Sequence, residues 1–128
     1  MPIASGLLDV DYTDEMYDER AGTHMSRRRL RKVFHGDIEG ESAGEFLMAV
    51  SPGGSAAYVG IDGVTAAIRG VSGSFVLVHS ATRSTDSESA QITVLPGSAT
   101  DELAGLRGTL TIGVQPDGTH TYTFNYEL

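Results

Sequence analysis

The sequence predicts an all-β protein: a small antiparallel β-barrel of about eight strands with at most one short helical turn. Three observations favour this fold. Short segments of alternating apolar and polar residues recur along the chain, separated by turns rich in glycine and proline. Glycine accounts for 16 of the 128 residues, and several glycines fall inside expected strands, where they suit the sharply coiled strands of a closed sheet. No segment has the length and period of a substantial helix.

The composition limits the class of protein. A chain of 128 residues is expected to form one domain, here residues 1–128. The net charge of -8 argues against nonspecific binding to nucleic acid or to an anionic membrane surface. Cysteine is absent, which excludes disulfides and thiolate chemistry. With no signal peptide and no run near the ~20 apolar residues of a membrane helix, we expect a soluble, cytoplasmic protein.

The N-terminal part is expected to contain two strands joined by a loop. Residues 3–12 alternate weakly and form the first strand, and the acidic, polar residues 13–23 form the loop. Residues 25–34 form the second strand, because their side chains alternate between two faces. One face carries Arg27, Arg29 and Arg31, and the other carries Arg28, Leu30, Lys32 and Phe34.

The central segment has the clearest alternation in the chain. One face carries Ile38, Gly40, Ser42, Gly44, Phe46 and Met48, and the other carries Asp37, Glu39, Glu41, Ala43, Glu45 and Leu47. Glycines in a strand often mark a bend or a close backbone approach, so the first face is expected to lie against something close. The line of carboxylates is either a solvated outer wall or the floor of a polar cavity, and both interpretations stay open.

The rest of the chain is expected to consist of short strands and turns. The Asp62-Gly63 pair is typical of a hairpin turn, which would separate two strands. The expected strands are residues 55–61, 64–69, 73–82, 90–95, 106–114 and 119–128, and the expected helical turn is residues 100–105.

Five motifs taken together resemble the bacterial family DUF3224, whose function is unknown. The motifs are residues 34–42, Tyr58-Val59-Gly60, residues 73–79, residues 96–108 and residues 122–128. The resemblance implies a barrel of the allene oxide cyclase type, a class that includes cyclases and isomerases of hydrophobic molecules, some in natural-product pathways. It also implies a second activity, an acidic self-cleaving peptidase. Asp62 departs from the family pattern, in which glutamate is usual at this position.

Two kinds of side chain are candidates for acid–base chemistry. Glu41 or Glu45 could act as a general acid or base if it faced a dry cavity, since burial raises the pKa of a carboxyl; the alternative is an exposed polar face. His79 shares a face with Phe75 and Leu77 on the most apolar strand and could donate a hydrogen bond or relay a proton. The alternative for His79 is a core histidine with its hydrogen bonds satisfied.

Four aromatic residues are candidates for ligand binding, namely Tyr58, Tyr122, Phe124 and Tyr126. In a barrel mouth the tyrosine hydroxyls could orient a carbonyl group or stabilise an enolate. The alternative is that these rings fill the core. No His-x-His or HExxH spacing occurs, so we expect no metal site, and the cyclase or isomerase chemistry considered below needs no cofactor.

The basic run of residues 27–32 could suggest a nucleic-acid site, but alternation divides it between two faces. We expect these arginines to pair with acidic side chains on the neighbouring strand, where opposite charges attract.

Three hypotheses for the function follow. The first is a small-molecule-binding barrel that acts as a cofactor-independent cyclase or isomerase on a hydrophobic substrate, with Glu41 or Glu45 as acid or base and Tyr58 and His79 as donors. The second is an acid peptidase with paired carboxylates, although the usual Asp-Thr/Ser-Gly motif is absent. The third is a noncatalytic binding or assembly protein. Barrels of this class often self-associate, so a homo-oligomer is compatible with all three.

Overall fold

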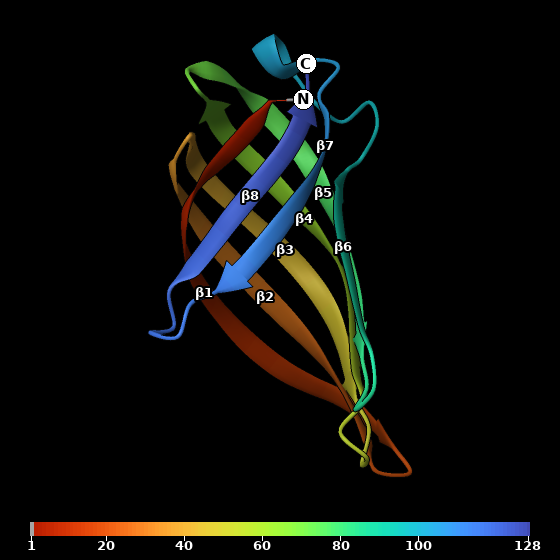
Figure 1. Ribbon diagram of the computed structural model, residues 1–128. Coiled ribbons are helices and arrows are strands. Elements are labelled where there is room, and N and C mark those ends of the chain that lie inside the picture. Colours follow the sequence, from red (N-terminus) through yellow and green to blue (C-terminus); the bar gives the residue numbers. More distant parts are fainter. Residues whose placement is uncertain (1) are drawn as a thin grey trace.

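The computed structural model describes residues 2–128 and confirms the predicted all-β fold (Figure 1). Within these residues eight antiparallel strands form a closed barrel, in which each strand pairs with its neighbours in sequence and β8 pairs with β1. The strands are β1 (Ile3–Arg20), β2 (Thr23–Gly36), β3 (Ile38–Val50), β4 (Ala56–Ile68), β5 (Val71–Arg83), β6 (Glu88–Val94), β7 (Arg107–Val114) and β8 (His120–Glu127). One 3-10 turn, η1 (Asp101–Leu103), lies between β6 and β7.

The acidic segment predicted as a loop is in fact a strand. Residues 13–20 continue β1 as far as Arg20, in antiparallel register with the basic run of β2. Asp14 lies opposite Arg28, and Glu15 lies opposite Arg27. Opposite charges across the two strands favour pairing that composition alone does not reveal.

The predicted hairpin turn at Asp62-Gly63 is also wrong. Both residues lie in the middle of β4, which is continuous from Ala56 to Ile68. The chain turns instead at Arg69 and Gly70, whose φ angles of 48° and 83° are those of a tight hairpin turn. Asp62 is therefore an inward-facing strand residue.

One end of the barrel is closed. At the other end the barrel is open on one side. The β8 strand pairs only with residues 3–8 of β1, and β6 pairs with β7 only at Thr93 and Thr109. The later part of β1 and the early part of β6 therefore extend beyond β7 and β8 (Figure 1). The chain ends lie at the opposite, closed end.

The closed end contains the hydrophobic core. Its buried side chains include Leu8, Phe34, Ile38, Ile68, Phe75, Leu77, Leu110, Tyr122 and Phe124. Leu103 of η1 and Leu106 add to this core. No helix among residues 2–128 has the length and apolar character needed to cross a membrane.

The strand β3 has the two faces that the sequence predicts. Ile38, Ser42 and Phe46 are buried, whereas Glu39, Glu41 and Glu45 are exposed. The line of carboxylates is therefore the outer wall of the barrel. Arg27 and Arg29 each approach Glu45 at 3.8 Å on this outer face, which agrees with the predicted pairing of the basic run with acids.

Candidate functional site

Three charged or ionisable side chains meet inside the barrel. Lys32 of β2, Asp62 of β4 and His79 of β5 are only 4%, 0% and 3% exposed. The Lys32 Nζ donates a hydrogen bond of 2.7 Å to Asp62 Oδ2. The His79 Nε2 lies 3.4 Å from the same oxygen, without the alignment of a hydrogen bond. We call these residues the interior triad.

Two inward-facing glycines make room for the interior triad. Gly44 of β3 lies directly opposite Asp62, and a Cβ atom at Gly44 would lie 3.0 Å from Asp62 Oδ1 and 2.6 Å from the Ile61 carbonyl oxygen. The ring of Phe46 packs directly against Gly60 of β4. A Cβ atom at Gly60 would overlap this ring. That ring packs edge-on against the His79 imidazole, with centroids 4.7 Å apart. Small residues at these positions therefore shape the site.

The interior triad combines an ion pair with a neutral imidazole near pH 7. Burial alone would raise the pKa of Asp62, but contacts with His79 and Lys32 outweigh it and hold that pKa below its usual value. Burial lowers the pKa of His79, and the Lys32 charge lowers it further, although Asp62 opposes both effects. Asp62 is thus a carboxylate, while His79 is available to accept a proton.

Three buried polar atoms beside this cluster have no hydrogen-bond partner within residues 2–128. They are Asp62 Oδ1, His79 Nε2 and Ser42 Oγ. Ser42 lies on β3 directly opposite Lys32. Buried polar atoms are almost always paired, because leaving one unpaired costs about 1–3 kcal/mol. Unpaired atoms on three neighbouring strands mark positions where ordered water or a bound molecule can supply the missing contacts.

A cavity of about 260 Å³ connects the interior triad with the open side of the barrel. Its apolar walls are Val10, Leu30, Phe46, Met48 and Ile112, and its polar lining is Tyr12, Arg28, Lys32, Tyr58, His79 and His120. The volume lies just below the range of about 300–1,000 Å³ of pockets for drug-sized ligands. The cavity therefore suits a small molecule that is mainly apolar.

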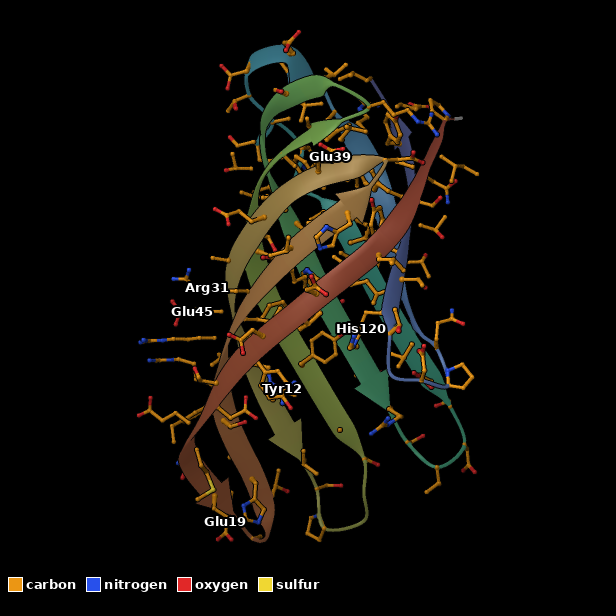
Figure 2. All side chains as sticks on the ribbon, turned by 90° about the vertical axis from the view of Figure 1, so that its left-hand side faces the viewer. Tyr12, Glu19, Arg31, Glu39, Glu45 and His120 are labelled. Atoms are coloured by element: carbon orange, nitrogen blue, oxygen red, sulfur yellow. The ribbon has the colours of Figure 1, made fainter. Side chains whose placement is uncertain are left out.

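The mouth of the cavity is held by a contact between β1 and β2. Arg28 makes two hydrogen bonds to the Asp14 carboxylate, of 2.7 and 2.9 Å, and these hold the pKa of Asp14 below its usual value. The Arg28 guanidinium also lies 3.8 Å from the centre of the Tyr12 ring. Tyr12 and His120 lie on the open side between β1 and β8 (Figure 2).

The structure separates the predicted catalytic residues. Glu41 and Glu45 are exposed on the outer face, so of the two interpretations left open by the sequence the structure shows the outer polar face, and the dry cavity on which their acid–base role depended is not around them. The physical reason is the alternation of β3, which turns Ser42 and Gly44 inward. Arg31 and Glu45 both point away from the barrel (Figure 2). His79, in contrast, belongs to the interior triad and lines the cavity.

The predicted ligand-binding aromatic residues are also divided between two places. Tyr58 lines the cavity, and its pKa is raised by burial and by the charge of Glu88, so its hydroxyl stays protonated. Tyr122, Phe124 and Tyr126 are buried at the closed end and do not line the cavity. The Tyr122 hydroxyl accepts a hydrogen bond from the Ile38 N–H at 2.9 Å and donates one to the His35 carbonyl at 2.8 Å. These three rings therefore fill the core, which is the alternative interpretation of the sequence.

Sequence reasoning did not select Lys32 or Asp62. One signal was available for Lys32, which shares a strand face with Leu30 and Phe34 and is the only lysine in the chain. Asp62 precedes a glycine and therefore has the pattern of a turn residue. Its position in β4 depends on pairing with β3 and β5, which the sequence does not show locally.

Other features of the surface are less suited to ligand binding. Two larger hollows, of about 640 and 470 Å³, lie along β1 to β4 and are lined in part by outward-facing residues such as Arg31, Ala43 and Gly63. Within residues 2–128 no three His, Asp or Glu side chains gather as a metal site requires. The cavity beside the interior triad is lined by Lys32 and by His79, whose buried Nε2 is unpaired within residues 2–128.

Comparisons with known proteins agree with this fold. The family model described as "Protein of unknown function (DUF3224)" matches residues 4–126. The crystal structure of a DUF3224 family protein with unknown function from Shewanella oneidensis MR-1 is similar, with a TM-score of 0.93 and 35% sequence identity. That match covers 100% of this chain and 98% of the other chain. No curated protein matches the chain. The chain therefore belongs to the DUF3224 family.

Proposed function

We propose that the barrel binds a small, mainly apolar carbonyl compound in its cavity and moves a proton on it, as a cofactor-independent isomerase or cyclase does. The observation that carries this proposal is that Lys32 and His79, whose buried Nε2 has no hydrogen-bond partner within residues 2–128, line a mainly apolar cavity. The predicted likeness to allene oxide cyclase-type barrels supports the same class of reaction.

The interior triad supplies the groups that such a proton transfer needs. The neutral imidazole of His79 accepts a proton from the carbon next to the carbonyl group. Lys32 lines the same cavity, and its positive charge would stabilise the negative charge that develops on the ligand. The apolar walls exclude water, which strengthens both effects. Tyr58 adds a hydroxyl donor at the cavity wall.

The same geometry argues against the acid peptidase. A pair of carboxylates that share a proton must lie side by side. Within residues 2–128, Asp62 is the only buried carboxylate, and its nearest ionisable neighbours, Lys32 and His79, are basic groups rather than a second acid. The interior triad therefore favours proton transfer on a ligand over activation of water by two acids.

The test is exchange of the α-protons of a small ketone in heavy water. Cyclohexanone is incubated with the purified protein, and loss of its α-proton signal is followed by NMR. We expect the protein to accelerate exchange over buffer. We expect Asp62→Asn and His79→Gln to lower the rate by about 100-fold or more, since general acid–base catalysis contributes about 10²–10⁴-fold.

Glu41→Gln and Glu45→Gln are the matched controls, because they remove carboxylates from the outer face of the same barrel. We expect both variants to keep the wild-type rate. Exchange that depends on Glu41 or Glu45 but not on the interior triad would overturn the assignment. If the wild-type protein shifts the NMR signals of cavity residues without exchange, the barrel binds ketones but is not an isomerase.

A further inference from the structure

We propose that Lys32 captures an aldehyde or ketone covalently, as a protonated imine with Asp62 as its counterion. This inference rests on the proposed function and names the chemical class of its substrate. The combination that carries it is a single buried lysine with a carboxylate, an unpaired imidazole and an apolar cavity around it.

The use of lysine at this position is specific. Of the nine lysine and arginine residues in the chain, Lys32 is the only lysine. Arginine is the better partner for a buried carboxylate, because its planar group binds both oxygens, but it cannot form an imine. An ion pair needed for structure alone would be served as well by arginine or by two apolar residues. A primary amine therefore stands where the surroundings favour other residues.

The position of Lys32 combines burial with access to the cavity. Its side chain is only 4% exposed, yet it lines the cavity together with Leu30, Phe46 and Met48. The Nζ atom lies 5.8 Å from the centre of the Phe46 ring. Imine formation releases water, and a cavity with apolar walls disfavours the return of water that would hydrolyse the imine.

Asp62 carries the protons that the condensation moves. Its Oδ2 lies 2.7 Å from the Lys32 Nζ and takes up one proton transiently as the nitrogen lone pair attacks the carbonyl carbon. The C–N bond forms, and the carbonyl oxygen takes the proton held by Asp62. A second nitrogen proton then transfers to the same oxygen through Asp62, the C–O bond breaks, and water leaves.

The balance of charge is the strongest feature of this step. One ammonium group and one carbonyl compound give one protonated imine and one water, so the positive charge opposite Asp62 is retained. The buried carboxylate, which would be unpaired beside a neutral adduct, therefore faces one positive charge both before and after the condensation. Once the imine exists, His79 Nε2 can accept the α-proton, and the C–H electrons neutralise the imine nitrogen as an enamine forms.

The experiment is reductive trapping of the full chain. The protein is incubated with cyclohexanone and sodium cyanoborohydride, which reduces an imine to a stable secondary amine. Intact mass and peptide mapping then locate the adduct. Because Lys32 is the only lysine, the N-terminal amine is the one other primary amine and serves as an internal reference. We expect Lys32 to be labelled at least tenfold faster than the N-terminus.

Lys32→Arg is the matched variant, since it keeps the positive charge and removes the primary amine. We expect Lys32→Arg to lose both the internal adduct and the α-proton exchange, with circular dichroism confirming that it folds. If only the N-terminal amine of the wild-type protein is labelled and Lys32→Arg still exchanges, the imine is overturned while the proposed function stands. If the wild-type protein neither exchanges nor binds cyclohexanone, the proposed function itself fails.

Discussion

The Nζ atom of Lys32 lies 2.7 Å from Oδ2 of Asp62 in the interior of the barrel, and both side chains are almost completely buried. Removing two charges from water costs more than their attraction usually returns, so a pair of this kind is poor evidence of a contribution to stability. The adjacent cavity and the unpaired atoms on Asp62, His79 and Ser42 give it a different explanation. The pair prepares a charged site inside an apolar barrel.

This relationship predicts a characteristic pattern of stabilities. We expect Asp62→Asn to lower the free energy of unfolding by about 3–5 kcal/mol, because it leaves the Lys32 ammonium buried without its carboxylate. We expect the double variant Lys32→Met with Asp62→Leu to lose much less free energy of unfolding than Asp62→Asn loses. Urea denaturation of the single and double variants measures both values. A double variant that is less stable than Asp62→Asn would show that the ion pair holds the barrel together.

The sequence predicted the barrel because its signals are local. Alternation over β3 and the density of β-forming residues in β5 depend only on neighbouring residues, and the structure confirms both elements. The division of β3 into two faces was also predicted, with Ser42 and Gly44 on one face and Glu41 and Glu45 on the other. What alternation does not provide is which face of the strand is inside, and this is why Glu41 and Glu45 were candidates.

The site was harder to predict because it depends on partners far apart in the chain. Lys32 and Asp62 are thirty residues apart and meet only when β2, β3 and β4 align. Asp62 has a local pattern, Asp-Gly, that competes with the strand and normally prevails in hairpins. In this chain the pairing of β4 with both neighbours overrides the local turn preference.

A second prediction concerns the space that Gly44 leaves for Asp62. We expect Gly44→Ala to destabilise the protein by about 1–3 kcal/mol, the usual range for added bulk in a packed interior. The added Cβ would meet the Ile61 carbonyl oxygen at 2.6 Å and Asp62 Oδ1 at 3.0 Å, so Asp62 must also shift. Thermal unfolding measures the stability, and the NMR signal of the His79 ring reports the shift.

Gly53→Ala is the control, because nothing lies within 4 Å of a Cβ atom added at that position. We expect its stability to stay within about 0.5 kcal/mol of the wild type. Equal effects of the two substitutions would mean that glycine at Gly44 has no role in shaping the site.

A third prediction separates the closed end from the site. Tyr122→Phe removes the acceptor of the Ile38 N–H and the donor to the His35 carbonyl. We expect a loss of about 1–3 kcal/mol in stability, since a buried N–H is left unpaired. Ketone exchange should not change, because Tyr122 does not line the cavity.

Tyr126→Phe on the same strand is the matched control, since the Tyr126 hydroxyl makes no side-chain hydrogen bond within residues 2–128. We expect this variant to be nearly as stable as the wild type. If Tyr122→Phe keeps the wild-type stability but exchanges the ketone protons more slowly, Tyr122 takes part in ligand binding.

The fourth prediction is a dependence of stability on pH that comes from His79. Because its pKa in the folded protein is below the ordinary value of about 6.5, the unfolded chain binds a proton there at a pH where the folded protein does not. Stability should therefore fall as the pH is lowered through about 6.5, by at most about 1.4 kcal/mol per pH unit from this residue. The pKa of Asp62 is depressed, as is usual for a paired carboxylate. Its contribution to stability is therefore lost only when the pH falls below the ordinary pKa of 3.8.

The contribution of His79 can be measured by urea denaturation of the wild type and His79→Gln between about pH 7 and pH 5, which lies above the pH at which the contribution of Asp62 is lost. His24, His35 and His120 are present in both proteins, so the difference between the two pH slopes isolates His79. We expect the wild-type free energy of unfolding to fall more steeply with decreasing pH than that of the variant. Parallel slopes would mean that His79 titrates in the folded barrel as it does in the unfolded chain, which would remove the neutral imidazole on which the proton transfer depends.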